Sequence, residues 1–417
     1  EENILQAIER VKSSGHRYLL GYILPIAQEM QRTLEKSGTV TDISLGGSIR
    51  RRKETIGDVD ILATSDVPEE VMEVFCNLSG VSQVLARGPT KSSVVLANGL
   101  HVDLRVVAKE SYGAALQYFT GSKEHNIHLR ELSIAKDWKL SEYGLIGRSS
   151  DKVIAAGREE EIYHALGLSW IEPELREDRG EIEAATEGNL PHLVGYDEIR
   201  GDLHVHTNWS EGSHSIAEMA ETARGLGYEY IAICDHSRAL PVAHGMTDEE
   251  IREQMKEIEK LNRQMEGFTL LTGIEANIDR DGNLDVGSTV LGDLDVVVAS
   301  VHSGFKMPEQ EMTERVLTAM QNEHVDIIGH PTGRIINKRD PYQIDLTRIF
   351  GAAPALGVLL EINAFPRRLD LSDVNCMRAR EFGVRFSLGS DAHNRSNLRY
   401  MEFGVATARR GWLEKKD

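Results

Sequence analysis

The sequence predicts an α/β protein of several domains, in which a mixed sheet module precedes a barrel. Its 417 residues exceed the size at which one hydrophobic core stops growing, roughly 250–300 residues. From Gly201 onward, short apolar runs with strand character alternate with helical segments, an order typical of a mainly parallel sheet. Seven such runs are followed by metal-binding side chain types, which favours a closed barrel over an open sheet.

An amphipathic helix is expected near the start of the chain. Between Tyr18 and Lys36, apolar residues recur at helical spacing, and Gly38 is a typical C-terminal stop. Strand patterns follow at 42–45, 59–63, 93–96 and 101–107. We expect the chain to divide into a helical segment (1–40), a mixed α/β module (41–110), a helical and mixed module (111–167), an acidic linker (168–196) and a metal-binding domain (197–417).

The charge distribution bears on possible partners. A net charge of −19 argues at first against a nucleic-acid partner. However, residues 1–150 hold 18 Lys+Arg against 19 Asp+Glu, whereas residues 196–417 hold 25 against 36. Most of the acidity therefore lies outside the N-terminal module, and excess carboxylate is expected in a domain that binds divalent cations.

The cysteines and the hydropathy pattern indicate the compartment. Cys76, Cys234 and Cys376 are far apart, stand in apolar contexts and form no Cys-x-x-Cys pair. They fit buried thiols in a reducing environment better than a disulfide framework. No apolar run approaches the length of about 20 residues that spans a bilayer. We expect a soluble, cytoplasmic monomer without a membrane partner.

The seven apolar runs of the second half end in segments rich in histidine and carboxylate. These segments are 202–206, 234–236, 273–275, 300–302, 329–330, 359–361 and 390–393. A single histidine of this kind is more often a satisfied polar residue at a strand end, but nine donors in register favour a metal site. The candidate ligands are His204, His206, Glu211, His236, Glu275, His302, His330, Asp391 and His393.

Mixed imidazole and carboxylate donors suit Mn, Zn or Fe, and nine donors need more than one ion. Clustered ions lower the pKa of bound water and suit phosphoester hydrolysis. The motifs resemble those of the PHP (polymerase and histidinol phosphatase) family over about half of the chain. The resemblance implies a distorted seven-stranded β/α barrel with up to three Mn²⁺, Zn²⁺ or Fe²⁺ ions. Glu211 stands where that family usually has Asp.

A second carboxylate group lies in the first half. Asp58 and Asp60 are two residues apart in an expected strand, so both project to one face, and Asp103 offers a third carboxylate from another strand. Such a group can hold two Mg²⁺ or Mn²⁺ ions. Upstream, residues 46–53 (Gly-Gly-Ser-Ile-Arg-Arg-Arg-Lys) combine a turn, a hydroxyl and four cations, which suits a triphosphate. Together these features indicate nucleotidyl transfer.

The pentapeptide Tyr-Phe-Thr-Gly-Ser at 118–122, with the motifs before it, resembles the palm and thumb of the family X DNA polymerases. The resemblance covers about residues 1–167 and implies that Asp58, Asp60 and Asp103 are catalytic metal ligands. It implies nucleotide contacts from Gly47, Ser48, Arg51, Gly57, Tyr118, Phe119, Gly121, Asn126 and Arg130. His101 stands where vertebrate members have arginine.

The whole chain resembles bacterial and archaeal family X polymerases that end in a PHP domain. Those proteins usually begin with a small helical DNA-binding domain, and this sequence starts after it, so we expect a fragment or a reduced form. The resemblance implies gap filling with dNTPs on a DNA primer-template and 3′–5′ exonuclease activity. Two alternatives remain: a phosphomonoesterase of the histidinol-phosphatase type, and a DNA end-binding protein whose polymerase half is inactive.

Overall fold

The computed structural model describes residues 17–238 and 244–417. The expected helical segment at 1–40 is therefore described only from Arg17 onward. The chain divides into two compact units, residues 1–191 and 192–417, and each is treated by itself. The three cysteines are buried free thiols. Within the described ranges, no helix is both long and apolar enough to cross a membrane.

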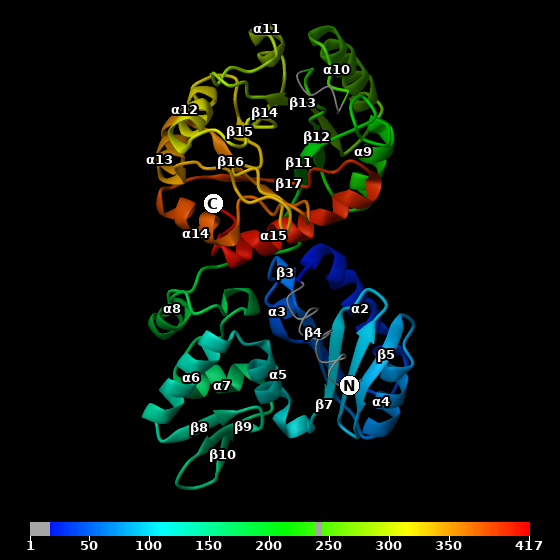
Figure 1. The fold of residues 1–417 in the computed structure, drawn as a ribbon, viewed down its shortest axis with the longest axis vertical. Coiled ribbons are helices and arrows are strands. Elements are labelled where there is room, and N and C mark those ends of the chain that lie inside the picture. The colour runs from blue at the N-terminus through cyan, green and yellow to red at the C-terminus, as the bar shows by residue number, and fades with distance from the viewer. Residues whose placement is uncertain (1–16, 239–243) are drawn as a thin grey trace, which may run out of the picture. The chain divides into compact units, whose positions relative to one another are not determined.

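The first unit contains a five-stranded sheet with the order β2-β4-β7-β6-β5, in which β4 and β7 form the parallel pair (Figure 1). The strands are β2 (Asp42–Leu45), β4 (Asp58–Thr64), β5 (Val81–Arg87), β6 (Lys91–Leu96) and β7 (His101–Val106). Two further strands, β1 (Tyr18–Leu19) and β3 (Thr55–Ile56), form a separate pair. Helices α2 (Leu20–Lys36) and α4 (Pro68–Cys76) contact the five-stranded sheet.

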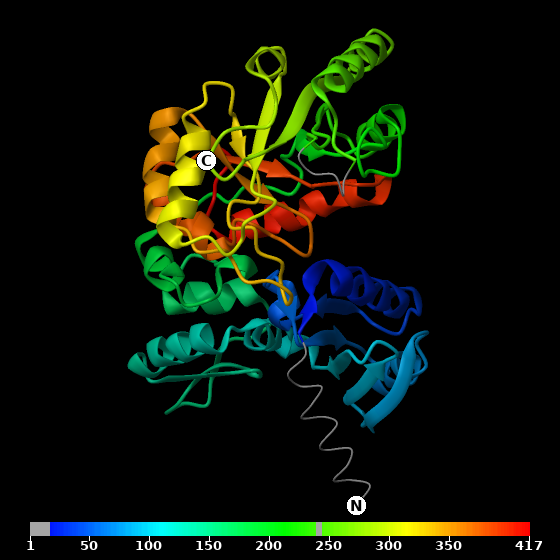
Figure 2. The same ribbon diagram turned by 45° about the horizontal axis from the view of Figure 1, so that its top comes forward.

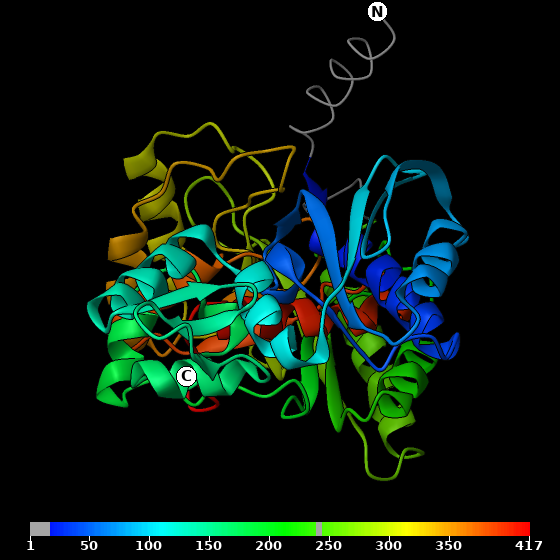
Figure 3. The same cartoon turned by 90° about the horizontal axis from the view of Figure 1, so that it is seen from below.

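A helical region with a small sheet completes this unit. Its helices are α5 (Tyr112–Thr120), α6 (Lys123–Ala135), α7 (Glu159–Leu166) and α8 (Glu181–Glu187), with the short η1 (Lys109–Ser111) and η2 (Pro173–Leu175). Its strands β8 (Trp138–Ser141), β9 (Gly144–Gly147) and β10 (Val153–Ala155) form a three-stranded antiparallel sheet. Figure 3 shows the two sheets of the unit, with α5 and α3 (Gly47–Arg50) between them.

The second unit is a nearly closed barrel of seven parallel strands in sequential order (Figure 1). The strands are β11 (Gly201–Val205), β12 (Tyr230–Ile233), β13 (Thr269–Asn277), β14 (Val296–Ser300), β15 (Ile327–Ile328), β16 (Leu359–Asn363) and β17 (Phe386–Gly389). The first and last strands approach each other through a parallel bridge between Val205 and Ala392. The amide of His206 donates to the carbonyl of Ala392 at 2.9 Å.

Helices surround this barrel and bury its outer face. They are α9 (Ile216–Gly225), α10 (Asp248–Asn262), α11 (Ser288–Leu291), α12 (Glu309–Met320), α13 (Leu346–Leu356), α14 (Asp373–Glu381), η4 (Arg395–Tyr400) and α15 (Met401–Arg410). Figure 2 shows α12 and α13 side by side on one flank, where they contact each other. Capping boxes begin α9 and α10: Ser215 pairs with Glu218, and Thr247 with Glu250.

Most of the expected elements are confirmed. The apolar residues of α2 that recur at helical spacing are buried, as the pattern predicts. The four expected strands of the first half correspond to β2, β4, β6 and β7, and all seven expected barrel strands are present. Residues 168–191, expected to belong to a linker, contain η2 and α8, and they include the fully buried side chains of Arg176 and Glu181.

Two candidate metal centres

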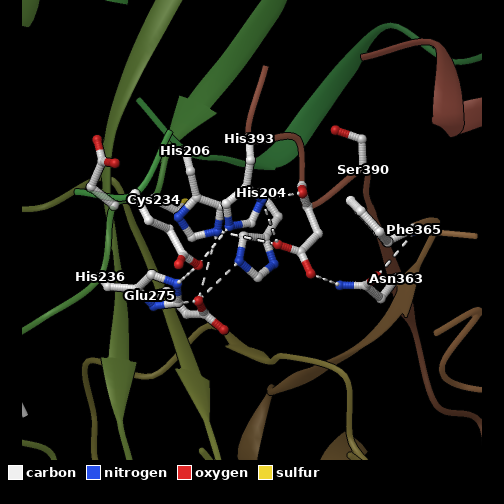
Figure 4. A network of polar contacts seen from close by, with 12 residues as sticks. His204, His206, Cys234, His236, Glu275, Asn363, Phe365, Ser390 and His393 are labelled. Carbon is white, nitrogen blue, oxygen red and sulfur yellow. Dashed lines mark hydrogen bonds and ion pairs between the residues drawn. The ribbon is translucent and has the colours of Figure 1, made fainter. Parts of the chain in front are cut away.

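Glu275, in β13, lies at the centre of the histidine cluster in the barrel (Figure 4). Its Oε2 lies 2.9 Å from Nδ1 of His236 and 3.5 Å from Nε2 of His204. Its Oε1 lies 2.9 Å from Nε2 of His330 and 3.2 Å from Nε2 of His302. These groups come from the ends of five different strands, so the parallel order of the barrel brings them to one place.

The other four candidate ligands adjoin this group. Oδ1 of Asp391 lies 3.3 Å from Nε2 of His206. Oε1 of Glu211, in the loop after β11, lies 2.8 Å from Nε2 of His393 and 3.1 Å from Nε2 of His236. The structure thus brings all nine candidate ligands together, with Glu211 in the position from which it can reach two histidines.

The donor set fits a multi-metal site. The donor atoms form three groups, and within each group all of them lie within 4.8 Å of one another. The groups are His206, His236 and His393; His204, His206 and Asp391; and His236, Glu275 and His302. Among the described residues, Nε2 of His204 and both ring nitrogens of His206 and His302 are buried without a hydrogen-bond partner. Buried polar atoms without partners are costly, and metal ions would supply the missing interactions.

Electrostatics support the same interpretation. Burial lowers the pKa of His206 to about 3, together with the nearby rings of His393 and His236, so this imidazole is neutral and can donate a lone pair. Burial alone would raise the pKa of Glu275, but the histidines around it hold that pKa well below its ordinary value. An ionised carboxylate and a neutral imidazole are the protonation states that bind cations, so Glu275 and His206 are ready to do so. Burial alone would lower the pKa of His236, but the carboxylates of Glu275 and Glu211 raise it to about 10, so His236 would release a proton when a metal ion binds.

Glu361, in β16, supports the cluster but was not among the candidate ligands. Its Oε1 lies 2.6 Å from Nδ1 of His204, and its Oε2 accepts a hydrogen bond from the amide of His330 at 2.6 Å. The contact with Nδ1 leaves Nε2 of His204 as the ring nitrogen that faces the other donors. The segment 359–361 carried the signal, since its apolar run ends in a carboxylate as the other runs do.

Two further buried aspartates hold the loops that carry ligands. Asp202 accepts hydrogen bonds from the amide of Ser390, at 3.0 Å, and from its hydroxyl. Asp235 accepts from the amide of Thr207 at 2.8 Å and from Gln254 at 2.7 Å. These contacts position Ser390, next to Asp391, and Thr207, next to His206. Sequence reasoning did not assign them, although both stand beside histidines of the motifs.

The three carboxylates of the first unit lie on its parallel strand pair. Asp60 in β4 is directly opposite Asp103 in β7, and Asp58 is opposite His101. Burial, together with the charges of Asp58 and Asp103, raises the pKa of Asp60 to about 6. A divalent cation would relieve this repulsion, so the residues fit the metal site that the sequence indicates. A cavity of about 600 Å³ adjoins them, and Gly57 and Asp58 are among its lining residues.

The segment expected to bind a triphosphate lies against these carboxylates. Gly47 and Ser48 begin α3, and the amide of Gly46 donates to the carbonyl of Asp60 at 2.8 Å. Gly47 has a φ of +60°, and a Cβ there would lie 3.0 Å from Oδ2 of Asp60. Only glycine avoids both the unfavourable backbone angle and this close approach. Nε of Arg51 pairs with Glu177 at 3.0 Å, and its guanidinium also donates to the carbonyl of Thr120.

The remaining candidate nucleotide contacts cluster at α5 and α6. Tyr118 and Phe119 are half-buried at the end of α5, and Gly121 follows with a φ of +68°. The side chain of Asn126 donates to the carbonyl of Tyr118 at 2.7 Å. Arg130 is one helical turn further along α6, on the same face as Asn126. Phe119 packs under the guanidinium of Arg105 at 4.6 Å.

A buried ion-pair network that the sequence did not predict joins the two sheet-bearing regions of this unit. The two terminal nitrogens of the Arg50 guanidinium, Nη1 and Nη2, contact the carboxylate of Glu159 at 2.9 and 2.8 Å. Arg176, which is fully buried, contacts the same carboxylate. Burial alone would raise the pKa of Glu159, but Arg176 and Arg50 lower it to about 2. Arg50 therefore ties the segment beside the carboxylates to α7.

Comparisons with known proteins agree with this geometry. The family model for the DNA polymerase beta thumb matches residues 115–177, and the model for the PHP domain matches residues 202–364. The DNA polymerase/3′-5′ exonuclease PolX of Bacillus subtilis (strain 168) is 42% identical over 419 aligned positions, covering 100% of this chain and 73% of that protein.

Two further relatives match about half of this chain. A probable phosphatase of Thermoanaerobacter sp. (strain X514) is 34% identical over 203 residues, which is 46% of this chain and 78% of the relative. A probable phosphatase of Shewanella sp. (strain ANA-3) is 33% identical over 202 residues, with 46% and 75% covered. Because the similarity to the Bacillus subtilis protein extends over both units, the chain belongs to the bacterial PolX family, the family X DNA polymerases that carry a PHP domain.

Proposed function

We propose that this chain extends DNA 3′ ends with dNTPs in its first unit and removes nucleotides from 3′ ends in its second. The full-length similarity to a DNA polymerase/3′-5′ exonuclease carries this proposal. The side chains that each chemistry needs are present: three carboxylates on adjacent strands, and a separate buried histidine cluster. The intact carboxylates argue against a purely DNA-binding first unit.

In the polymerase site, Asp58, Asp60 and Asp103 would hold Mg²⁺ or Mn²⁺, which lowers the pKa of the attacking 3′-hydroxyl and stabilises the pyrophosphate leaving group. Gly47 and Ser48 would offer backbone and hydroxyl donors to the triphosphate. Arg51 and Gly57 would also contact the nucleotide.

The incoming nucleotide would contact both helices beyond the sheet. Tyr118, Phe119 and Gly121 would exclude a ribose 2′-hydroxyl, because their turn leaves little room beside the sugar. Asn126 and Arg130 lie one turn apart on one face of α6, and would contact the base and the template strand.

In the second unit, Glu275 and the eight other ligands around it would hold up to three ions, Mn²⁺, Zn²⁺ or Fe²⁺. Such ions supply a hydroxide at neutral pH and stabilise the charge that develops on the phosphate. Glu361 would hold the ring of His204 so that Nε2 faces an ion. Glu211 and His393 are the most exposed of these ligands, with 38% and 26% of their side chains accessible, so the DNA end would enter on their side.

The probable phosphatases that match about half of this chain favour a second candidate reaction for the histidine cluster. The same cluster would hydrolyse terminal phosphomonoesters, for example a 3′-phosphate that blocks extension. The buried free thiols fit a reducing compartment, and we place the protein in the cytoplasm, acting as a monomer on primer-template or gapped DNA.

The test is an assay of a 5′-labelled primer on a gapped template with Mn²⁺, with and without dNTPs. Wild-type protein should lengthen the primer with dNTPs and shorten it without them. Asp58→Asn with Asp60→Asn should abolish extension and retain shortening, whereas His204→Ala with His206→Ala should do the reverse. A primer carrying a 3′-phosphate tests the second candidate reaction.

Circular dichroism and thermal unfolding of each double variant control for folding. If either double substitution removed both activities from a folded protein, the proposal of two separate sites would be wrong. If wild-type protein released phosphate from a small monoester and left DNA unchanged, the second unit would be a phosphomonoesterase instead.

A further inference from the structure

Two loops follow β15 and β16 at the end of the barrel that carries the histidine cluster. They comprise residues 331–339 and 364–369, and we call them the paired loops. The amide of Ile336 donates to the carbonyl of Arg367 at 2.7 Å. Nε of Arg334 donates to the carbonyl of Arg368 at 2.8 Å. These two cross-links make the loops one continuous surface element.

The paired loops are basic within an acidic domain. Residues 196–417 hold 25 Lys+Arg against 36 Asp+Glu, but residues 331–339 and 364–369 hold five Lys+Arg and no Asp or Glu. The five cations are Arg334, Lys338, Arg339, Arg367 and Arg368. Such a local reversal of charge beside a site for phosphoester hydrolysis suits an anionic substrate.

Arg368 brings this positive charge to the metal ligands. Its Nε lies 3.3 Å from Oδ2 of Asp391, and 22% of its side chain is accessible. Phe365, on the same loop, lies edge-on to His393, with the ring centroids 6.4 Å apart, and edge-on to Tyr400 at 5.3 Å. Figure 4 shows Phe365 beside Asn363 at the border of the cluster. A cation and an aromatic ring thus stand next to two neighbouring ligands, Asp391 and His393.

Arg339 extends the basic surface away from the cluster. Its guanidinium lies 3.9 Å from the centre of the Phe305 ring and donates to the carbonyl of Gly333 at 3.0 Å. Burial lowers the pKa of Arg339, and the positive charge of Arg368 adds to this effect. Two guanidinium groups that repel each other are stabilised by an anion placed between them.

We propose that the paired loops bind the sugar-phosphate backbone of a single DNA strand whose 3′ end enters the metal centre. Arg368 contacts the phosphate nearest the ligands, and Phe365 packs against the terminal nucleoside. Arg339, Lys338 and Arg367 contact phosphates further from the end. Aromatic and cationic side chains in this combination are typical of proteins that bind single strands without reading sequence. This inference rests on the proposed exonuclease function.

The experiment uses the full chain with Lys338→Gln and Arg367→Gln combined, since both side chains are exposed and lie outside the histidine cluster. Degradation of a 5′-labelled single strand is followed in Mn²⁺ over a range of salt concentrations. The KM for DNA should rise several-fold. The slope of log KM against log salt should fall by about 1.4, because each phosphate contact with a single strand contributes roughly 0.7.

Two comparisons separate strand binding from general damage. Arg385→Gln removes an exposed cation just before β17, at the opposite end of the barrel, and should leave KM and the salt slope at their wild-type values. Bis(p-nitrophenyl) phosphate is too short to reach the outer cations, so the double variant should lose at least five times more activity on DNA than on this diester. Lys338→Arg combined with Arg367→Lys keeps both positive charges and should show the wild-type slope of log KM against log salt.

The outcomes distinguish the inference from the proposed function. If wild-type protein degrades DNA and the double Gln variant has the wild-type KM and slope, the paired loops do not bind the strand. Equal losses on DNA and on the small diester would also overturn the inference, because they would indicate a distorted site. If wild-type protein does not degrade DNA at all, the proposed function fails and the inference fails with it.

Discussion

The two candidate metal centres differ in how completely the protein prepares them. Asp58, Asp60 and Asp103 come from two neighbouring strands, and burial together with the charges of the other two carboxylates raises the pKa of Asp60 to about 6. The nine ligands of the histidine cluster come from six of the seven barrel strands or from the loops that follow them, and β16 supplies the supporting Glu361. There, carboxylates and imidazoles are interleaved, and Glu275 alone approaches five histidines.

This difference predicts how each centre acquires its ions. Few donors around an open cavity fit ions that arrive with the nucleotide and leave with pyrophosphate, since the triphosphate itself completes the coordination. Many buried donors fit ions that stay between turnovers. We therefore expect one exchangeable centre and one resident centre in a single chain.

Removal of the metal ions should have the largest effect. After desalting into metal-free buffer, the protein should retain ions at the histidine cluster, measured by elemental mass spectrometry, and none at the carboxylates. Prolonged treatment with a chelator should then abolish both activities. Extension should return as soon as Mg²⁺ is added, whereas shortening should return slowly and only with a transition metal.

His204→Ala with His206→Ala is the control, because it should remove the retained ions. If wild-type protein and this variant retained the same metal content, the histidine cluster would not hold resident ions. Equal recovery times for both activities would show that the two centres exchange ions alike.

A smaller effect is expected for Glu361→Gln. The amide has nearly the same shape but cannot hold the ring of His204 by charge, and substitutions of groups that orient a metal ligand typically cost about 10–100-fold in metal affinity or activity. Shortening should therefore fall by about that factor. Extension should not change, because Glu361 lies in the second unit. Glu381→Gln, on the exposed side of α14, is a matched control. If the Glu361→Gln variant shortened DNA at the wild-type rate, Glu361 would not position His204.

The smallest expected effect concerns pH at the carboxylates. The pKa of Asp60 is raised above its ordinary value, so Asp60 takes up a proton as pH falls through about 6, and a metal ion must then displace that proton. Mn²⁺ affinity should drop up to about tenfold per pH unit below this value. Electron paramagnetic resonance measures the Mn²⁺ affinity of the His204→Ala, His206→Ala variant. Equal Mn²⁺ affinity at pH 5.0 and at pH 7.5 would contradict the raised pKa of Asp60.

The sequence predicts the parts of the fold whose signal is local. Apolar runs of the barrel strands are regular because each strand is buried, and the histidine and carboxylate residues after them mark the strand ends. β5 was missed because it is an edge strand with a largely exposed pattern and so lacks clear apolar alternation. Period alone cannot identify such a strand.

Contacts between distant residues were the other omission. Glu361 and His204 are 157 residues apart, and only barrel closure brings them together. Glu159 and Glu181 stand in stretches whose composition indicates solvent exposure, yet both are buried against Arg176 or His125. A charge that is neutralised by a partner far along the chain has no local signature.

The bridge between Val205 and Ala392 has a consequence for synthesis of the protein. His204 belongs to the first barrel strand to leave the ribosome and His206 directly follows that strand, whereas Asp391 and His393 follow the last strand. The donor groups that include His206 with Asp391 or His393 cannot form until that last segment has emerged and closed the seam. A nascent chain therefore completes this donor set only after the segment that closes the barrel has been synthesised.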